Sequence, residues 1–477
     1  MYKHFVYQSK KQSSNTLYDV IIVGAGASGS ALLYTLAQYS SIESIALIEK
    51  YERPGQVNSK ASNNSQTLHV GDIETNYSLE KVQQVYPAAM MIVHYAQTLS
   101  IKERSRFLFP TTKMVLGVGE KEVTTLKKRY EDLKVIFPYL QKLEREELRR
   151  IEPAIIEGRK EDIPLIALYT TKGYAVDFEC LSEQFVNHAK KIRPDIDLFF
   201  SQTVKHLEHI KDGYKITTQT GQILTARALV VDADSYSLLL AQQLGYGKEF
   251  SLIPIAGSFY FSQKILHSKV YTVQNPKLPF AAVHGDPDVK SEKKETRWGP
   301  TARFYPALEA RNIRTMWDFI KSSGLERPQT WLSFIMILLD PIRFFYLLKN
   351  MLYELPIIGK IMFIRNVRKI VPKASIFDMR YARGYGGMRL QRVDTRTREL
   401  ILGEGKIIGR KAIFNMTPSP GASVSLYNAM RDAETIASFL DNSNLFHKSK
   451  MVSELYKSSN TQTTFFEDLS QKDTYVS

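Results

Sequence analysis

Cysteine is almost absent from this chain of 477 residues, which contains only Cys180. A single cysteine excludes an intramolecular disulfide, and it also excludes any zinc or iron–sulfur site that needs several thiolates from this chain. Such sparing use of cysteine is typical of proteins that work in a reducing compartment. We therefore expect a fold held together by packing alone, and no metal site.

The sequence also lacks an apolar run long enough to cross a membrane. A helical span needs about 20 consecutive apolar residues, and the nearest stretch, 331–348, is interrupted by Asp340, Pro341 and Arg343. Residues 1–14 contain lysine and glutamine but no apolar core of a secretory signal. We expect a cytoplasmic protein, or one that is bound peripherally to a membrane.

Acidic residues are outnumbered by basic ones. The chain has 49 aspartates and glutamates against 64 lysines and arginines, which gives a net charge of +15. This excess favours anionic partners such as acidic substrates or an anionic membrane surface. The basic residues are spread along the chain and no nucleic-acid-binding module is present, so we expect no nucleic acid partner.

What the sequence does contain begins with residues 19–30, DVIIVGAGASGS, in which an apolar run feeds a Gly-x-Gly-x-x-Gly turn. Gly24 permits the tight bend, Gly26 lets the backbone approach a pyrophosphate, and Gly29 lets the following helix pack closely on the strand. This pattern predicts a strand, a phosphate-binding turn and a helix.

The helix after this turn begins at Ala27 and Ser28, where unpaired N–H groups and the positive end of the helix dipole suit phosphate. A second apolar segment, 44–49, ends in Glu49 and is followed by Lys50. An acid at this distance is expected to bind a ribose hydroxyl. Together these features predict a Rossmann-type dinucleotide-binding unit. A nicotinamide-dependent reductase is not favoured, because it needs a second such turn and the sequence has none.

The alternation of strand and helix patterns predicts an α/β protein, α+β overall, with two domains and a tail. The dinucleotide-binding domain is discontinuous, and an antiparallel-sheet substrate domain is inserted into it. The expected boundaries are 15–78, 150–245 and 376–442 for the first domain, 79–149 and 246–375 for the second, and 443–477 for a polar, frayed tail.

Residues 307–371 are predicted to form a helical insert that is apolar and basic at once. Aromatic residues such as Trp331 and Phe345 lie among basic ones such as Arg343 and Lys349. One interpretation is a helical subdomain whose apolar face joins the core. The other is an interfacial surface, with aromatic side chains among lipid headgroups and cations on anionic lipid. The two interpretations are compatible.

Several blocks of the sequence resemble the malate:quinone oxidoreductase family. The resemblance runs from residue 18 to about 440, with gaps in the helical insert. It is carried by 24–29 with Glu49, SNNSQTLH at 62–69, GYAVDF at 173–178, PIAGSFY at 254–260, HGDP at 284–287, WGPTA at 298–302, GMR at 387–389 and NMTPSPGA at 415–422.

The resemblance implies an FAD-dependent enzyme of the D-amino acid oxidase and hydroxyacid oxidase superfamily, with a Rossmann-type FAD-binding domain. It implies oxidation of L-malate to oxaloacetate, with the electrons passed to membrane quinone at the inner face of the cell membrane. Another 2-hydroxy acid, such as L-2-hydroxyglutarate, stays open as the substrate because the sequence does not give the length of the pocket. A non-catalytic flavin-binding scaffold at the membrane surface is a further alternative.

Oxidation of a 2-hydroxy acid needs a hydride acceptor, a base for the hydroxyl proton and cations for the carboxylates. His69 and His284 are the candidate bases, and the sequence does not decide between them. Arg389 presents a planar fork that matches a carboxylate, so we expect it to anchor the substrate. Tyr260 and Tyr385 are predicted to line the substrate pocket, together with His284.

Further contacts to FAD follow from the resemblance. They are expected at Ser65, Gln66, Thr67, Val204, Gly387, Pro420, Gly421, Ala422 and Ser423. The last four precede a helix, whose N–H groups are suited to stabilise negative charge on a reduced flavin. One departure is the acidic segment 232–235, where flavoproteins of this kind commonly have an Ala-Gly turn.

Overall fold

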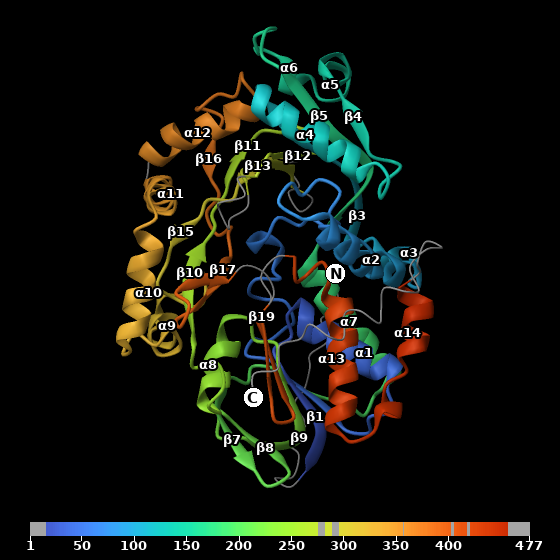
Figure 1. Cartoon of the computed structure of the whole chain (residues 1–477). Helices are drawn as coiled ribbons and strands as arrows, with labels where there is room; N and C mark the ends of the chain where they lie inside the picture. The colour runs from blue at the N-terminus through green and yellow to red at the C-terminus, as the bar shows by residue number, and fades with distance from the viewer. Residues whose placement is uncertain are drawn as a thin grey trace.

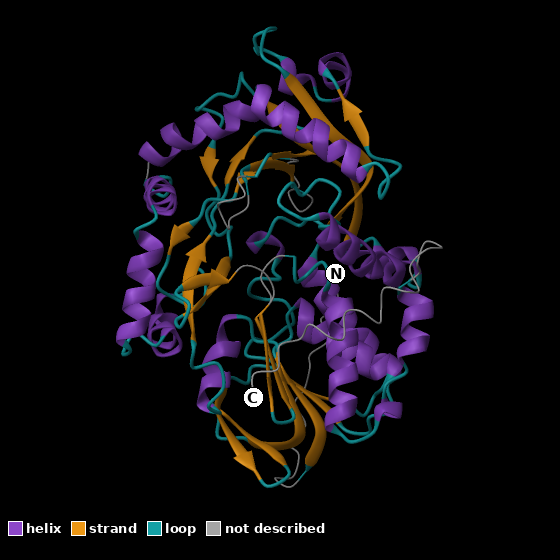
Figure 2. Ribbon diagram, viewed as in Figure 1, coloured by secondary structure: helices purple, strands orange, loops and turns teal. Residues whose placement is uncertain are grey.

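The computed structural model describes residues 16–274, 282–288, 295–355, 357–401, 405–416 and 420–456. In this part of the chain, two eight-stranded sheets lie at opposite ends of the molecule, and a four-stranded sheet lies between them. Figure 2 shows that helices line the outside of this arrangement. The three sheets therefore face a common interior.

The first sheet contains the predicted dinucleotide-binding unit. Its strands run in the order β19–β20–β9–β1–β2–β6, parallel except for β19. The bounds are β1 (Leu17–Val23), β2 (Ile45–Ile48), β6 (Asp197–Phe199), β9 (Ile223–Val231), β19 (Gly405–Gly409) and β20 (Ala412–Met416). The hairpin of β7 (Val204–Ile210) and β8 (Gly213–Thr218) joins it through β9. The predicted Rossmann-type sheet is confirmed.

Both faces of the first sheet are covered, which explains why β1 reads as a nearly continuous apolar run. Val20 and Ile22 pack toward α1 (Ala27–Tyr39), α7 (Phe178–Ile192) and α13 (Ser425–Phe439). Ile21 and Val23 pack toward α8 (Ser235–Gln243) and the β7–β8 hairpin. Alternate residues of one strand therefore build two separate cores.

The helical layer continues into the segment predicted to be a frayed tail. Helices α2 (Leu79–Gln97), α3 (Ile101–Arg104) and α14 (Lys448–Leu455) extend it. Met451 and Leu455 of α14 are buried in the same core as α2, and a short 3₁₀ turn, η3 (Ser443–Leu445), precedes them. The tail prediction is therefore wrong for residues 443–456, and the rest of that tail lies outside the described residues.

The second sheet is antiparallel except for the pairing of β12 with β3. Its strands, in order across the sheet, are β16 (Arg380–Tyr381), β11 (Tyr260–Ser262), β14 (Thr296–Gly299), β13 (His284–Pro287), β12 (Lys269–Thr272), β3 (Leu108–Val118), β5 (Leu165–Val176) and β4 (Gln141–Leu143). Helices α4 (Glu120–Leu133), α5 (Arg145–Ile151) and α6 (Pro153–Ile156) lie near β3 to β5. Strand β5 was expected in the first sheet, but its long antiparallel pairing with β3 holds it in the second.

The third sheet has the order β15–β10–β17–β18 and brings a C-terminal segment to the middle of the molecule. Its strands are β15 (Arg303–Phe304), β10 (Phe250–Ala256), β17 (Met388–Asp394) and β18 (Glu399–Ile401). Outside it run α9 (Met316–Ser323), α10 (Pro328–Leu338), α11 (Pro341–Leu352) and α12 (Ile358–Ile370), seen as the gold and orange column at the left of Figure 1. The predicted insert is thus helical.

Candidate functional site

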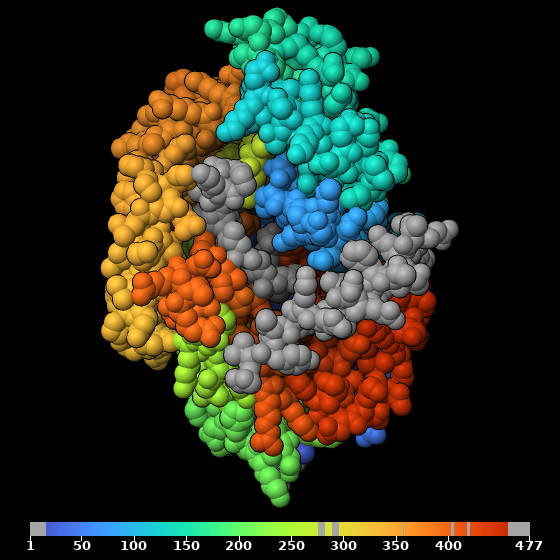
Figure 3. Space-filling view, viewed as in Figure 1, coloured from blue at the N-terminus to red at the C-terminus, as the bar shows by residue number. Residues whose placement is uncertain are grey.

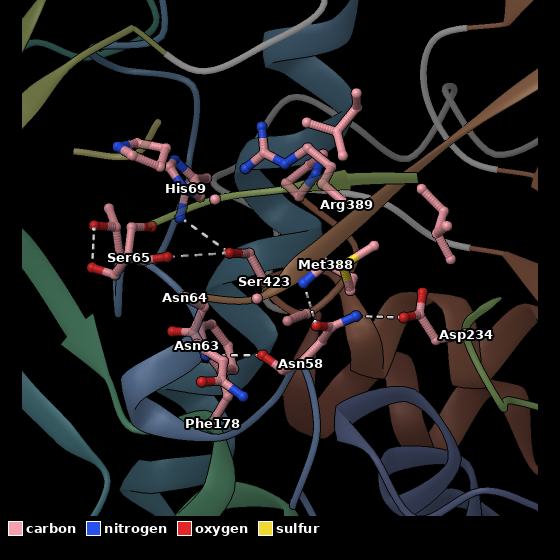
Figure 4. A pocket seen from close by; sticks show the side chains of 18 of the residues that line it. Asn58, Asn63, Asn64, Ser65, His69, Phe178, Asp234, Met388, Arg389 and Ser423 are labelled. Carbon is pink, nitrogen blue, oxygen red and sulfur yellow. Dashed lines mark hydrogen bonds between the residues drawn. The ribbon is translucent and has the colours of Figure 1, made fainter. Parts of the chain in front are cut away.

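A cavity of about 340 Å³ lies where the three sheets meet. Loops and strand ends from all three sheets line it, and Figure 4 shows part of this lining. Twelve of the predicted site residues are among those that line the cavity: Gly26, Ala27, Ser28, Ser65, Thr67, His69, His284, Gly387, Arg389, Pro420, Ala422 and Ser423. Gly26 and Ser423, which lie at opposite ends of the described chain, therefore meet at one site.

The glycine turn leaves one side open for a ligand. Gly24 has φ +104°, and a Cβ there would meet the Asp232 carbonyl oxygen at 2.4 Å. A Cβ at Gly29 would lie 2.0 Å from the Gly24 oxygen, so both glycines are required by packing. At Gly26 a Cβ would meet only the Ser59 Oγ at 3.4 Å, and this glycine lines the cavity. The backbone here permits the close approach that a pyrophosphate needs.

Glu49 braces this turn from behind. One of its carboxylate oxygens accepts a hydrogen bond from the Ala25 N–H at 2.6 Å, and the other accepts one from the Tyr51 N–H at 2.9 Å. Burial raises the pKa of Glu49, and the backbone hydrogen bonds oppose that rise. The neighbouring Lys50 is held by Glu309 at 2.5 Å. Neither Glu49 nor Lys50 is among the residues that line the cavity.

Both predicted pocket tyrosines lie elsewhere. The Tyr260 hydroxyl donates to the Tyr353 carbonyl oxygen at 2.6 Å, and its ring stacks on Phe363 at 4.7 Å. Tyr385 packs edge-on against Phe261 at 4.9 Å. Each tyrosine therefore belongs to a packed cluster of the second sheet, and the prediction that they line the substrate pocket is not borne out by their positions. Alternation along a strand decides which residues face a cavity, and a single Tyr in an apolar segment does not show its direction.

Three predicted cofactor contacts also lie off the cavity wall. Gln66 is buried with φ +54°, and its side-chain N–H donates to the Ala61 carbonyl oxygen at 3.1 Å. Val204 begins β7, where it pairs with Thr218 of the hairpin. Gly421 lies in the turn before α13 between two residues that do line the cavity. Of these, Gln66 shapes the loop that carries Ser65 and Thr67.

His69 lies on the cavity wall with one ring nitrogen already bonded. Its Nδ1 is 2.7 Å from the Glu74 carboxylate, whose other oxygen accepts a hydrogen bond from the Gly71 N–H at 2.8 Å. Burial opposes ionisation of Glu74, but the hydrogen bond from His69 and the charge of Lys113 lower the pKa of Glu74 to about 2. An ionised Glu74 makes Nδ1 of His69 the donor and leaves its Nε2 as the acceptor.

A fully buried ion pair supports the loop behind His69. The Lys113 Nζ lies 2.7 Å from Asp72, and both side chains have no exposed surface. Asp72 stands in the same loop as Glu74, whereas Lys113 comes from β3 of the second sheet. Because an unpaired buried charge is costly, this pair fixes the loop to the sheet. Glu74, Asp72 and Lys113 were not predicted from the sequence. The two acids within five residues of His69 could have indicated a carboxylate partner for its ring.

His284 lines the cavity from a different environment. It begins β13 rather than closing a strand, and residues 275–281 before it lie outside the described residues. Its Nδ1 faces the Ala282 carbonyl oxygen at 3.0 Å, and its Nε2 lies 3.2 Å from the Asp286 carboxylate. The ring stacks on Tyr271 at 4.4 Å. Both nitrogens therefore face acceptors.

Asp286 gathers a buried cluster of charges around itself. Lys269 lies 3.7 Å from it and Arg297 lies 3.8 Å from it, and all three side chains are at most 1% exposed. Burial lowers the pKa of Lys269 to about 8, although the charge of Asp286 opposes this shift. The Lys269 Nζ also donates to the Ser65 carbonyl oxygen at 2.9 Å. The cluster thus holds the loop that lies on the opposite wall.

Arg389, on β17, lines the cavity and is half-buried. Within the described residues its side chain makes no hydrogen bond and no ion pair. Desolvation lowers the pKa of Arg389, and the hydroxyls of Tyr346, Tyr77 and Tyr271 oppose that shift. In Figure 4 its side chain lies at the same end of the pocket as His69. A half-buried guanidinium without an ion-pair partner favours an anionic ligand.

The other end of the cavity is lined by amides and acids that the sequence analysis did not select. Asn58 accepts a hydrogen bond from the Met388 N–H at 3.0 Å and donates to Asp234, which has φ +50° (Figure 4). Burial and the charge of Asp432 raise the pKa of Asp232 to about 7. One oxygen of Asp232 and the side-chain oxygen of Asn415 are buried on this wall without a partner. Such atoms suit a polar ligand such as a dinucleotide.

Metal ligands do not gather in the part of the chain that the structure describes. No group of three histidine, cysteine, aspartate or glutamate side chains is arranged to hold an ion there.

Comparison of the sequence with protein families gives a match over residues 16–472 to the family described as malate:quinone oxidoreductase (Mqo). A protein of Campylobacter jejuni named probable malate:quinone oxidoreductase is 41% identical over 448 residues, which cover 92% of this chain and 99% of the relative. The malate:quinone oxidoreductase of Helicobacter pylori strain J99 is 42% identical over 434 residues, 89% of this chain and 95% of the relative.

Solved structures share the fold at low sequence identity. Glycine oxidase from Geobacillus kaustophilus superposes with a TM-score of 0.60 at 17% identity, covering 89% of this chain and 95% of that one. L-α-glycerophosphate oxidase from Mycoplasma pneumoniae, solved with FAD bound, gives a TM-score of 0.59 at 18% identity with the same coverage. The fold is therefore that of known oxidases.

Proposed function

Because the chain belongs to the malate:quinone oxidoreductase family, we propose that its cavity binds FAD and L-malate and that the protein oxidises malate to oxaloacetate. Malate loses two electrons and two protons, and quinone takes up two of each to become quinol. FAD, when bound, supplies the hydride acceptor. The single observation that carries the proposal is Arg389, a half-buried cation whose side chain makes no ion pair in the described residues, at the same end of the cavity as His69.

The FAD would be held mainly by the first sheet and its loops. The start of α1 offers the backbone N–H groups of Gly26 and Ser28 to the pyrophosphate, whereas the Ala27 N–H donates to the Ser59 Oγ at 3.0 Å. Glu49 supports the glycine turn from behind through its hydrogen bonds from the Ala25 and Tyr51 N–H groups, and Ser65, Thr67 and the residues before α13 line the rest of the cavity. The unpartnered oxygens of Asp232 and Asn415 support this fit. In this proposal the second and third sheets provide the substrate side.

His69 takes the hydroxyl proton of malate at Nε2. Its Nδ1 is held by Glu74, so the ring is fixed in the tautomer that leaves Nε2 free to accept a proton. When the ring becomes charged, the adjacent carboxylate stabilises it. Glu74 is thus a positioning residue, and it acts on the substrate only through His69.

Arg389 binds a malate carboxylate through its guanidinium fork. His284 shapes the wall beside the substrate rather than accepting its proton, because both ring nitrogens already face oxygen atoms of the protein. The cluster around Asp286 fixes His284 in place. Burial of these groups excludes water from the reacting end of the cavity, which strengthens each charged contact.

The protein would work at the inner face of a membrane, where its quinone is dissolved. Within the described residues no single helix is long and apolar enough to cross a membrane, and one bent pair, α10 with α11, passes the same test only when the two are taken together. The net charge of +15 favours an anionic membrane surface. We therefore infer a peripheral attachment.

Anaerobic titration of the purified protein with L-malate tests the function, with the flavin absorbance as the readout. Full bleaching by malate, and none by L-2-hydroxyglutarate, supports the proposal. Bleaching by L-2-hydroxyglutarate alone would move the assignment to that substrate with the same residues in the same roles. A protein that binds no flavin would leave only a scaffold role.

A further inference from the structure

Helices α10 and α11 expose most of their apolar side chains, unlike an ordinary surface helix. Over these helices and the turn between them, nine apolar residues are at least 45% exposed: Trp331, Leu332, Ile335, Met336, Leu338, Leu339, Phe344, Phe345 and Met351. The exposed apolar surface continues through the turn before α12 at Ile357 and Ile358. We call the outward apolar side of α10, α11 and residues 357–361 the docking face. It forms the gold and orange edge of the molecule in Figure 3.

The inner side of the same helices carries polar residues beside apolar ones. Thr330, Ser333 and Asn350 are buried, as is Ile337, and Tyr346 and Leu347 of α11 pack against the core residues Ile255 and Ala302. Asn350 accepts a hydrogen bond from the Ala302 N–H at 2.8 Å. This hydrogen bond and this packing fix the rotation of α11, so its exposed apolar side chains stay outward. A patch of this size on a soluble protein marks a contact with a partner or a membrane.

Basic residues predominate around the docking face, although Asp340 lies at the break between α10 and α11, 3.6 Å from Arg343. Helix α12 contains Lys360, Arg365, Arg368 and Lys369 and no acidic residue. Lys349 of α11 is exposed beside the apolar side chains. An apolar surface bordered by cations complements a bilayer with anionic headgroups. The same cations disfavour a second copy of this chain as the occupant, because a two-fold interface would bring like charges together.

The bend between α10 and α11 suits a pair of helices that lies on a membrane surface rather than one that crosses the bilayer. Helices α10 and α11 meet at 87°, and the Asp340 carboxylate caps α11 by accepting from the Ile342 N–H at 2.9 Å. An acidic cap at the break and a near right angle keep the pair from crossing the hydrocarbon as one rod. Both helices can instead lie in the interface with their apolar side down.

We propose that the docking face inserts among the headgroups and upper acyl chains of one leaflet of an anionic bilayer. This inference rests on the proposed function, because it identifies where the enzyme meets the membrane that holds its quinone. The helices of this face contact the wall of the cavity: Thr301 and Ala302, which line it, donate to Glu354 just after α11 at 2.7 Å and to Asn350 of α11 at 2.8 Å. The docking face therefore lies on the outer side of a helix that contacts the site.

The test uses the full-length protein and the double variant Leu339→Asp, Phe345→Asp. Vesicles of phosphatidylcholine with phosphatidylglycerol are used for flotation, and activity is measured with a water-soluble acceptor and with a long-chain quinone in the vesicles. We expect the native protein to float, and the variant to bind at least about tenfold more weakly. The variant should keep its malate turnover with the soluble acceptor and lose turnover with vesicle quinone.

Val135→Asp is the matched control, because Val135 is 80% exposed and lies on α4's loop, away from the docking face. It should bind vesicles and reduce vesicle quinone like the native protein. The double variant Lys360→Gln, Arg365→Gln tests the role of the basic residues. Loss of each positive charge should weaken binding to anionic vesicles about fivefold.

Unchanged flotation of the double variant would overturn the inference, and so would native binding that ignores lipid charge. A native dimer that the double variant converts to monomer, with vesicle binding intact, would assign the face to a second copy and would also overturn it. Failure of the proposed function looks different. The native protein would then bind vesicles through this face but would not oxidise malate with either acceptor.

Discussion

The two histidines of the cavity stand in opposite surroundings. His69 lies on a loop, its side chain is 17% exposed, and a single carboxylate holds one of its nitrogens. His284 lies on a strand, its side chain is 2% exposed, and oxygen atoms face both of its nitrogens. The residue type is the same, but the number of partners differs. One partner orients a base and leaves it a lone pair, whereas two partners turn the ring into a fixed part of the wall.

The largest expected effect tests the difference between His69 and His284 directly. We expect His69→Asn to lower kcat with a soluble acceptor by about 10²–10⁴-fold, because the variant loses the proton acceptor. His284→Asn should lower kcat by less than about tenfold. Steady-state kinetics of both variants, at matched flavin content, measures the difference. A larger loss in His284→Asn would reverse the two roles.

Arg389 separates substrate binding from proton transfer. We expect Arg389→Ala to raise KM for malate by about 100-fold, because it removes two charge-assisted hydrogen bonds that are each worth about 1.5 kcal/mol or more. Arg389→Lys keeps the charge but loses the fork, so it should recover only part of the affinity. An unchanged KM in Arg389→Ala, measured in the same assay, would rule out the anchoring role.

A variant of Glu74 tests the comparison further, because Glu74 is the partner that distinguishes His69 from His284. We expect Glu74→Gln to lower kcat/KM by about tenfold. The rise of kcat/KM with pH should also move to lower pH, because the charged ring loses the carboxylate that stabilises it. Glu152→Gln is the control: Glu152 is fully buried and accepts N–H groups of 267–268 away from the cavity. A pH profile that moves in neither variant would contradict the role of Glu74.

The smallest effect concerns stability in acid. The pKa of Glu74 is about 2 in the folded protein against 4.5 ordinarily. Its stabilisation is therefore fully present above about pH 4.5 and is lost as the pH falls toward 2. We expect Glu74 to contribute about 1–3 kcal/mol at pH 7. Urea unfolding of native protein and Glu74→Gln should differ at pH 7, and the difference should shrink steadily as the pH falls from about 4.5 toward 2; a difference that stays constant would contradict this.

The parts of the site that the sequence predicted are those that local geometry determines. The turn at Gly24, Gly26 and Gly29 takes its shape from steric limits within one strand and one helix. Features of this kind need no distant partner to be recognised, and the structure agrees with them.

What the sequence missed depends on contacts across long separations. β5 was assigned to the first sheet because its own residue pattern does not show which strand it pairs with. Its partner in the structure is β3 of the second sheet. Tyr260 was expected in the pocket, but its neighbours Tyr353 and Phe363 come from a different part of the chain. Glu74 returns to His69 through the bend at Gly71, which has φ +94°. Such a bend can be suspected from a glycine, but its direction is not encoded locally.

Docking through the outward apolar side of α10 and α11 changes which quinone concentration determines the turnover rate. An enzyme held on a bilayer finds its quinone by a two-dimensional search, so turnover should follow the mole fraction of quinone in the lipid rather than its amount per volume of suspension. Adding empty vesicles would then slow the enzyme by dilution of the acceptor. Malate, which arrives from water, would show no such dependence.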